Sequence, residues 1–169
     1  MKGSDFLKND RKVLGTSSHC KKVQHHDAIK ELVACQKAFD TLCFNAVMVH
    51  MSYDDQIELQ KLVMQMSHAH HHQCLDAFER GIEMFYTALY DISRMKHLKV
   101  ISEETRKHTH QCRVSMMTCF EHRQTFLEDA LDIYHSLCNK DAQRLENSIE
   151  KALMSIMHYH LSTKTMHIT

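Results

Sequence analysis

The chain contains no proline and only three glycines among its 169 residues. These two residue types break helices and form tight turns, so their scarcity leaves little material for the many turns of a β-sandwich or barrel. Apolar residues make up 43% of the chain and charged residues 25%, as in ordinary globular domains. A chain of this length can bury a single core. We therefore expect one all-α domain.

Apolar residues recur at steps of three and four along four segments, which is the period of an amphipathic helix. The predicted helices span residues 20–50, 53–97, 103–138 and 141–161. Ser52 can cap the second helix, Ser102 resembles the start of the third, and residues 139–141 form a tight turn. Short links favour antiparallel neighbours, so the sequence predicts an up-down-up-down four-helix bundle.

The bundle is expected to occupy residues 19–162, between a flexible tail at 1–18 and a frayed end at 163–169. Folding the chain at residues 52, 100 and 140 leaves residues 84–118 without neighbours from the first and fourth helices. These residues would project as a hairpin of the second and third helices, roughly 25 Å long at 1.5 Å per residue.

Four apolar residues of the predicted hairpin have no cover from the first and fourth helices. They are Phe85, Leu89, Ile92 and Met116. Uncovered apolar surface commonly marks an interaction site. We therefore expect a non-enzymatic protein–protein interaction module that self-associates, so that its partner is another protein or a second copy of the chain.

Basic and acidic residues are equal in number, 21 of each, so no overall field attracts nucleic acid and none is expected as a partner. The predicted hairpin tip is nevertheless basic. Its positive residues are Arg94, Lys96, Lys99, Arg106, Lys107 and Arg113. Such a tip can contact an anionic membrane surface or an acidic partner. Long antiparallel helices with a basic tip resemble BAR-type modules at the level of fold, which makes a membrane-associating module the first alternative.

Histidine is unusually abundant, with 16 residues, four of them in the middle of the second predicted helix. His68 and His72 are four residues apart, as are His70 and Cys74, and each pair can place two metal ligands on one helical face. The apolar stripe of this helix passes through His70. We therefore expect His70 in the core, with a hydrogen bond, and His68, His71 and His72 on a solvated face.

A second set of possible ligands falls at one level of the predicted bundle: His26, Glu79, His122 and His160. Imidazole and carboxylate ligands hold divalent metals in the cores of other helical bundles. A metal-binding four-helix bundle is therefore the second alternative. The paired Glu-x-x-His units of di-iron bundles do not occur in the sequence, so no bound cofactor is predicted.

The remaining residue types favour a binding role over catalysis. Seven cysteines without a Cys-x-x-Cys pair argue against a disulfide framework, and twelve methionines suit irregular core filling. The sequence contains no nucleophile elbow or phosphate-binding loop, so enzymatic activity is not expected. The first residues lack an apolar signal segment, and no apolar run approaches the ~20 residues of a membrane span. The expected location is the cytoplasm.

Overall fold

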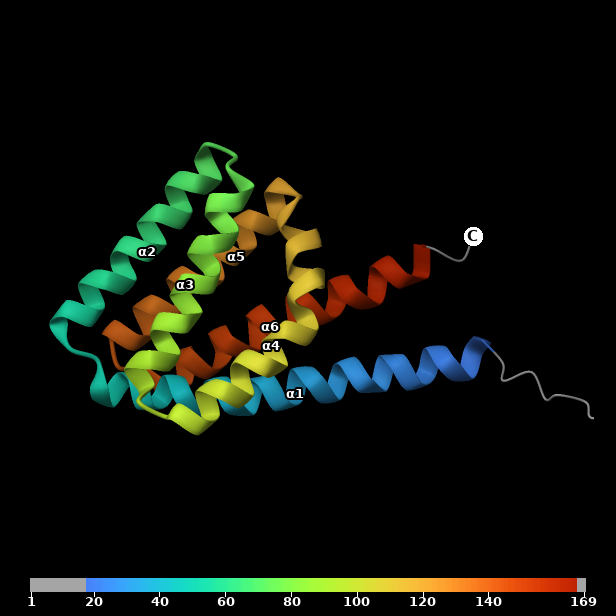
Figure 1. Ribbon diagram of the computed structural model, residues 1–169, viewed down its shortest axis with the longest axis horizontal. Coiled ribbons are helices and arrows are strands. Elements are labelled where there is room, and N and C mark those ends of the chain that lie inside the picture. The colour runs from blue at the N-terminus through green and yellow to red at the C-terminus, as the bar shows by residue number, and fades with distance from the viewer. Residues whose placement is uncertain (1–17, 167–169) are drawn as a thin grey trace, which may run out of the picture.

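The computed structural model describes the backbone of residues 18–166 and the side chains of residues 27–162. This part of the chain forms six α-helices and no strand (Figure 1): α1 (Ser18–His50), α2 (Tyr53–His71), α3 (Leu75–Ser93), α4 (Lys96–Met117), α5 (Phe120–Cys138) and α6 (Ala142–Met166). The all-α prediction is confirmed. The predicted four-helix topology is corrected to six helices, because the second and third predicted helices are each divided in two.

The second predicted helix ends inside its histidine-rich centre. Gln73 has a left-handed backbone, with φ of 54°. The backbone N–H of Cys74 donates to the carbonyl of Ala69 at 2.9 Å, and the N–H of Gln73 donates to that of His70 at 3.1 Å. These two bonds form a Schellman motif, which closes a helix and satisfies its last carbonyls. Glycine usually occupies this left-handed position, so the glutamine at residue 73 gives no sign in the sequence that a helix ends here.

The third predicted helix is divided between Thr118 and Cys119, where α4 ends and α5 begins. Arg123 is buried, and its Nη1 donates to the carbonyl of Met117 at 2.7 Å and to that of Thr118 at 3.2 Å. A side chain from the first turn of α5 thus satisfies the last carbonyls of α4. The start of this predicted helix at Ser102 is also corrected, because Ser102 lies fully buried within α4.

The two other predicted links are confirmed. Ser52 caps α2 through a capping box, in which the Asp55 N–H donates to Ser52 Oγ at 3.2 Å and the Ser52 N–H donates to Asp55 Oδ2 at 2.8 Å. Residues 139–141 form a second Schellman turn between α5 and α6, with Lys140 at φ 54°. The predicted tail lies almost entirely outside the described residues, and α6 continues as a helix past residue 162 to Met166.

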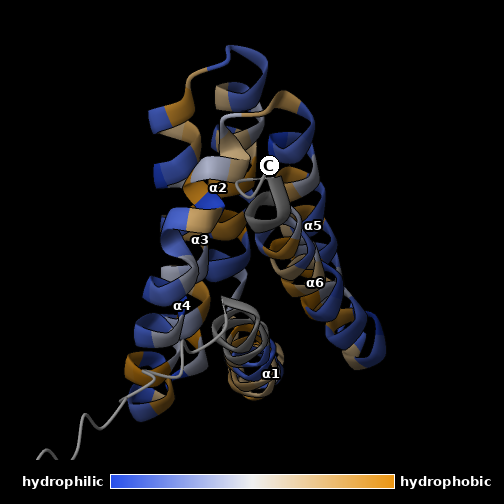
Figure 2. Cartoon of the chain, turned by 90° about the vertical axis from the view of Figure 1, so that its right-hand side faces the viewer, coloured by the Kyte–Doolittle hydropathy of each residue, from blue (hydrophilic) through white to orange (hydrophobic). Residues whose placement is uncertain are grey.

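The six helices pack around one apolar core (Figure 1). α2 and α3 form one antiparallel pair, α5 and α6 a second, and α1 lies along both α6 and α3. Gly81 allows α3 to approach α2 closely, since a Cβ at this position would lie 2.6 Å from Cγ of Met66. In Figure 2 the hydrophobic residues of the helices gather on their inward sides.

The predicted projecting hairpin does not form, because α4 folds back and contacts α1, α3, α5 and α6. Its apolar residues are therefore covered within one chain. Phe85 and Leu89 are completely buried, Met116 is 2% exposed, and Ile92 packs against the core while half-buried. The surface predicted for self-association is thus part of the core.

The segment Asp27–His50 of α1 is long and apolar enough to cross a membrane by length and composition. In this fold the same segment supplies core residues, with Cys43, Phe44 and Val47 all completely buried against the other helices. Its apolar character therefore has an explanation in the packing of α1.

Candidate functional site

The inward side of α4 is polar where a core helix is normally apolar. Four residues at steps of four, three and four are buried: Ser102, Arg106, Thr109 and Arg113. They face α3 and α1, which supply further polar residues. Three of the four, with residues of α1 and α3, form what we term the polar cluster. Its members are Gln36, Asp40, Glu83, Tyr86, Tyr90, Arg106, Thr109 and Arg113. Buried charge on this scale costs several kcal/mol per ion unless it is paired.

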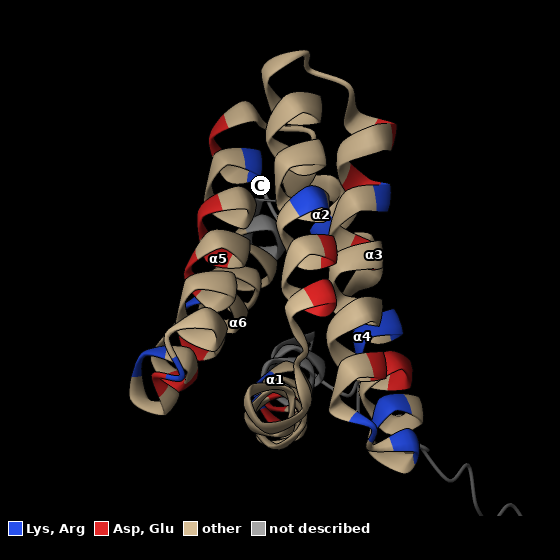
Figure 3. Cartoon of the chain, turned by 90° about the vertical axis from the view of Figure 1, so that its left-hand side faces the viewer, with Lys and Arg blue, Asp and Glu red and all other residues tan. Residues whose placement is uncertain are grey.

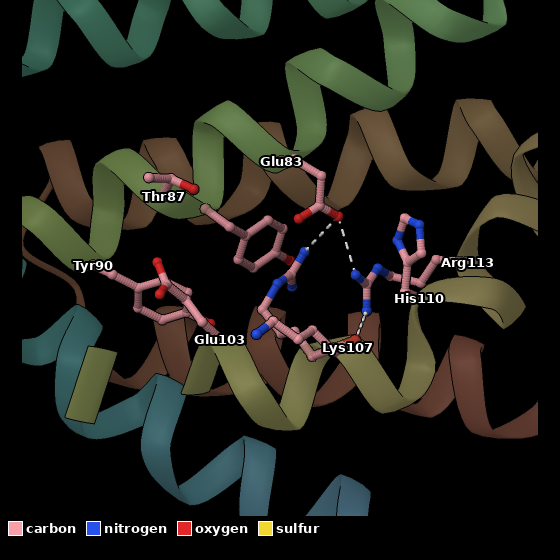
Figure 4. A pocket seen from close by; sticks show the side chains of 9 residues that line it. Glu83, Thr87, Tyr90, Glu103, Lys107, His110 and Arg113 are labelled. Atoms are coloured by element: carbon pink, nitrogen blue, oxygen red, sulfur yellow. Dashed lines mark hydrogen bonds and ion pairs between the residues drawn. The ribbon is translucent and has the colours of Figure 1, made fainter. Parts of the chain in front are cut away.

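Two arginines of α4 converge on one carboxylate of α3 (Figure 4). Nη2 of Arg113 lies 3.0 Å from Oε1 of Glu83, and Nη2 of Arg106 lies 3.4 Å from the same oxygen. The side chain of Arg106 is 7% exposed and that of Arg113 is 3% exposed, whereas that of Glu83 is 41% exposed. Both cations are therefore withdrawn from water, and their shared anion still reaches it.

Further contacts hold the two guanidinium groups in place. Nη1 of Arg113 donates to Oγ1 of Thr109 at 2.6 Å and to the backbone carbonyl of Arg106 at 2.9 Å. The guanidinium carbon of Arg106 lies 3.7 Å from the ring centroid of Tyr86, a cation–π contact. The Nε of Arg113 is buried without a partner among the described residues. The arginines are thus fixed, and one donor is unused.

The second half of the polar cluster joins α1 to α3. Asp40 is 2% exposed, and its Oδ1 accepts hydrogen bonds from the Tyr90 hydroxyl at 2.7 Å and from Nε2 of Gln36 at 2.6 Å. Nε2 of Gln36 also lies 3.2 Å from the Tyr90 hydroxyl. These bonds fix the Asp40 carboxyl group beside Arg106 without a direct ion pair.

Burial and charge shift the pKa values of the cluster in different directions. Burial raises the pKa of Asp40 to about 6, although Arg106 and the two hydrogen bonds oppose the shift. Burial also acts to raise the pKa of Glu83, but the attraction of Arg106 and Arg113 outweighs it, so this pKa lies below its ordinary value. Burial, with repulsion from Arg106, lowers the pKa of Arg113 to about 10. Near pH 6 the cluster therefore gains or loses charge at Asp40.

A pocket of about 220 Å³ opens between α3 and α4 directly over this cluster (Figure 4). Its wall is formed by Arg106, Arg113, Tyr86 and Glu83, and its rim carries Lys107 and His110, among others. Fixed guanidinium groups with donors in a forked geometry are suited to binding carboxylate or phosphate oxygens. The arrangement can therefore hold a small anion.

The predicted basic tip is dispersed by the fold. Arg106 and Arg113 are buried in the polar cluster and cannot reach a membrane, which corrects their predicted role. Of the others, Lys99 pairs with Asp91, and Lys107 pairs with Glu104 at 2.8 Å. Arg94 and Lys96 remain exposed at the turn between α3 and α4. Figure 3 shows basic and acidic residues mixed along α4.

The predicted metal ligands are not brought together as a set. Glu79 lies on α3, where its Oε1 is 3.7 Å from Nε2 of His110. His122 packs edge-on against the ring of Tyr159 at 5.3 Å, near the start of α5. The side chain of His26 lies outside the described residues, and His160 lies on α6. Between residues 27 and 162, no three His, Cys, Asp or Glu side chains are placed to hold a metal ion.

The histidine-rich centre is placed largely as predicted. His70 is 1% exposed and stacks on Phe120 at 4.3 Å, while His68, His71 and His72 are exposed. Burial lowers the pKa of His70, with help from the charge of Arg123. The His70 ring has a side-chain hydrogen bond with Gln124, as expected, whereas its Nδ1 is buried with no partner in the described part of the chain.

Sequence reasoning missed most of the polar cluster, although a signal was present. Asp40 and Gln36 lie on the apolar stripe of α1, between Val33 and Cys43, at steps of three and four. Arg106 and Arg113 lie in the same way on the stripe that leads to Met116. A polar residue in a core position, on two helices at once, indicates a buried polar site.

No protein-family model matches this chain, and no curated protein is similar to it in sequence. Solved structures that match its fold include one described in these words: "Lar controls the expression of the Listeria monocytogenes agr system and mediates virulence". The two structures superpose with a TM-score of 0.64 at 13% sequence identity. The match covers 79% of this chain and 63% of the other, so the chain spans less than two thirds of that protein. At this identity the likeness shows a shared fold alone.

Proposed function

We propose that this chain is a non-enzymatic helical binding domain, and that the pocket over the polar cluster takes a small anion with a carboxylate or phosphate group. The observation that carries the proposal is the convergence of Arg106 and Arg113, both buried, on a single oxygen of Glu83 beside an open pocket. Buried, perturbed ionisable groups that line a pocket are more frequent at binding sites than elsewhere.

Glu83 occupies the position that the anionic group of a ligand would take. Its side chain is the exposed member of the ion triad, so it can turn toward solvent and leave both guanidinium groups to the ligand. The charge balance supports this exchange. Asp40 lies beside Arg106 without a direct ion pair, and Glu103 on the rim lies 3.7 Å from Lys99. Glu83 is therefore the carboxylate in contact with both guanidinium groups.

The size of the pocket limits the ligand. Drug-sized ligands usually occupy pockets of about 300–1,000 Å³, so a pocket of about 220 Å³ fits a molecule of only a few heavy atoms. Small mono- or dicarboxylates and phosphate are the matching class. Ligand binding to the folded state would stabilise it by roughly 2.7 kcal/mol at an anion concentration about 100 times Kd.

The test is thermal unfolding of the whole chain with a panel of small carboxylates, sulfate and phosphate at constant ionic strength. The proposal expects at least one of these anions to raise the unfolding temperature above that in chloride, followed by saturable binding in calorimetry. If none of them does so, the polar cluster is a structural ion network and the proposal fails.

The proposal also suits a regulatory role. The Listeria protein of similar fold is described as controlling expression, and a domain that binds a small anion can serve as the sensing part of a regulator. In this proposal the anion acts by replacing an internal contact between α3 and α4. The consequence would be a change in how these two helices pack.

A second proposed role, protein–protein interaction, is favoured by an apolar groove between α1 and α4. The groove has a volume of about 520 Å³ and is lined by Leu32, Phe39, Val100 and Ile101, among others. Val100 is 65% exposed and Ile101 44% exposed. Self-association of the chain would use this groove in place of the buried residues named in the sequence prediction, and light scattering would detect it.

A further inference from the structure

A buried carboxyl group lies one hydrogen bond behind the wall of the anion pocket. Tyr90 lines the pocket, and its hydroxyl group donates to Oδ1 of Asp40 at 2.7 Å. Asp40 belongs to α1, is 2% exposed and is not itself part of the pocket wall. An anion bound in the pocket would therefore lie near this carboxyl group without contacting it.

The cations that act on Asp40 come from α4. Arg106 and Arg113 both attract its carboxylate form, and Arg106 has the stronger effect. The other titratable groups that interact with it are Tyr86, Tyr90 and Cys43. Burial raises the pKa of each of these three groups, so all of them are uncharged near pH 6.

Two further carboxylates lie close to the polar cluster, and both are paired. Glu83 of α3 contacts the two arginines, which outweigh the effect of burial and hold its pKa below the ordinary value. Asp129 of α5 acts on the pKa of Tyr86 and pairs with Lys151 of α6 at 3.2 Å. Asp40 is thus the carboxyl group of the cluster without a direct ion pair.

Gln36 contacts the Asp40 carboxyl group and carries an unused acceptor. Its Nε2 donates to Oδ1 of Asp40 at 2.6 Å, while its Oε1 is buried without a partner among the described residues. A buried acceptor without a donor is unfavourable. A protonated carboxyl group is a donor, whereas an ionised one only accepts. The neutral form of Asp40 therefore supplies the kind of group that these surroundings lack.

The charge of Asp40 decides how much positive charge an incoming anion meets. When Asp40 is ionised, it and Glu83 together offset the two arginines, and an anion in the pocket adds a third negative charge. When Asp40 is protonated, one positive charge remains for the anion. Burial raises the pKa of Asp40 to about 6, so the change between these two states takes place close to neutral pH.

We propose that the pocket binds its anion together with a proton, which is held by Asp40. This inference rests on the anion site proposed above and adds its regulation. The anion binds more tightly at low pH, because the neutral carboxyl group no longer repels it. By linkage, the bound anion strengthens the binding of the proton to the same degree. A sensing domain with this site would respond to the anion and to acidity together.

The test is calorimetric titration of the full chain with sulfate and with formate, both of which stay ionised from pH 5 to pH 8. The affinity of the wild type should fall roughly tenfold over this range, which is a usual size for the coupling of two sites. Titrations at pH 6 in two buffers of different ionisation enthalpy should show net proton uptake on binding. Asp40→Asn resembles the protonated carboxyl group, so this variant should keep its affinity from pH 5 to pH 8 and lose most of the proton uptake.

The matched control is His110→Gln, because His110 on the pocket rim is also of a type that titrates in this range. Its affinity should fall with pH as that of the wild type does. Equal wild-type affinity at pH 5 and pH 8, with no proton uptake, would overturn the coupling and leave the anion site standing. A pH dependence that His110→Gln removes and Asp40→Asn retains would overturn the role of Asp40. Failure of both anions to bind at any pH would overturn the anion site and this inference with it.

Discussion

Arg113 of α4 donates a hydrogen bond of 3.0 Å to Glu83 of α3, and both arginines of the cluster share this carboxylate oxygen. The contact joins two helices through charges that are almost entirely removed from water on the arginine side. A buried ion pair adds little stability compared with an apolar pair, but the loss of one member is costly, because it leaves the other charge uncompensated. Loss of Glu83 would leave two buried cations, whereas loss of Arg113 leaves Glu83 partly exposed and paired with Arg106.

Arg113→Ala should destabilise the chain by about 2 kcal/mol, because the Thr109 hydroxyl and the Arg106 carbonyl lose a buried hydrogen bond and the core gains a void, while Glu83 keeps Arg106. Urea unfolding followed by circular dichroism measures the change. Lys107→Ala is the matched control, since Lys107 is exposed and pairs with Glu104 on the surface, and it should change stability by less than about 0.5 kcal/mol. Equal effects of the two substitutions would show that the cluster does not stabilise the fold.

Asp40 should make stability depend on pH between about 4 and 6. Its folded pKa of about 6 lies above the ordinary value of 3.8, so the folded state binds the proton more tightly, and this contribution is lost as pH rises through 6. The difference between these two pKa values corresponds to roughly 3 kcal/mol. Asp40→Asn keeps the oxygen that accepts from Tyr90 but removes the titrating carboxyl group. Because only the wild type loses this contribution, the variant should gain stability relative to it as pH rises from 4 to 7. A constant difference between the two proteins over this range would contradict the assignment.

Gln73→Gly should stabilise the chain by about 0.5–1 kcal/mol, because glycine adopts the left-handed backbone of this position at no steric cost. Gln60→Gly is the control in the exposed interior of α2, where glycine should cost about 1 kcal/mol. Thermal unfolding distinguishes the two. A loss of stability in both variants would mean that α2 and α3 are not separated by this turn.

Val100→Asp should weaken any self-association that uses the groove between α1 and α4, while leaving the folded monomer intact. Light scattering over a range of concentrations measures the mass. Met64→Asp on α2 is the control, because Met64 has the same exposure as Val100, 65%, and lies outside the groove. A mass that falls equally in both variants, or in neither, would exclude the groove as the contact surface.

The helical class and most helix positions could be predicted because they depend on the period of apolar residues. The two additional helix ends could not, since each depends on a contact that no periodicity reveals. At Gln73 the end is formed by two backbone hydrogen bonds with no glycine present, and at Thr118 it is formed by the buried side chain of Arg123. Because the chain turns between α4 and α5, α4 can fold back onto α1.

This difference in topology explains why several predicted site residues lie in the core. Arg106 and Arg113 belong to the predicted basic tip, and a projecting hairpin would place them in solvent. With α4 folded back, they meet Glu83 in the interior. Phe85 and Leu89 become core residues for the same reason. Asp40 was detectable in principle, as a carboxylate on an apolar stripe, but its partner Tyr90 belongs to a helix 50 residues away.

The most direct test of the anion site is to remove the internal anion that competes for it. Glu83→Gln leaves Arg106 and Arg113 without their carboxylate, so the variant should be less stable than the wild type in chloride. Acetate or phosphate at the same ionic strength should then restore its unfolding temperature, and bind to it more tightly than to the wild type. Glu79→Gln, one turn earlier on α3 and outside this pocket, should behave as the wild type. If acetate and phosphate raise the unfolding temperatures of all three proteins equally, or none of them, the arginine pair does not bind anions and the account is contradicted.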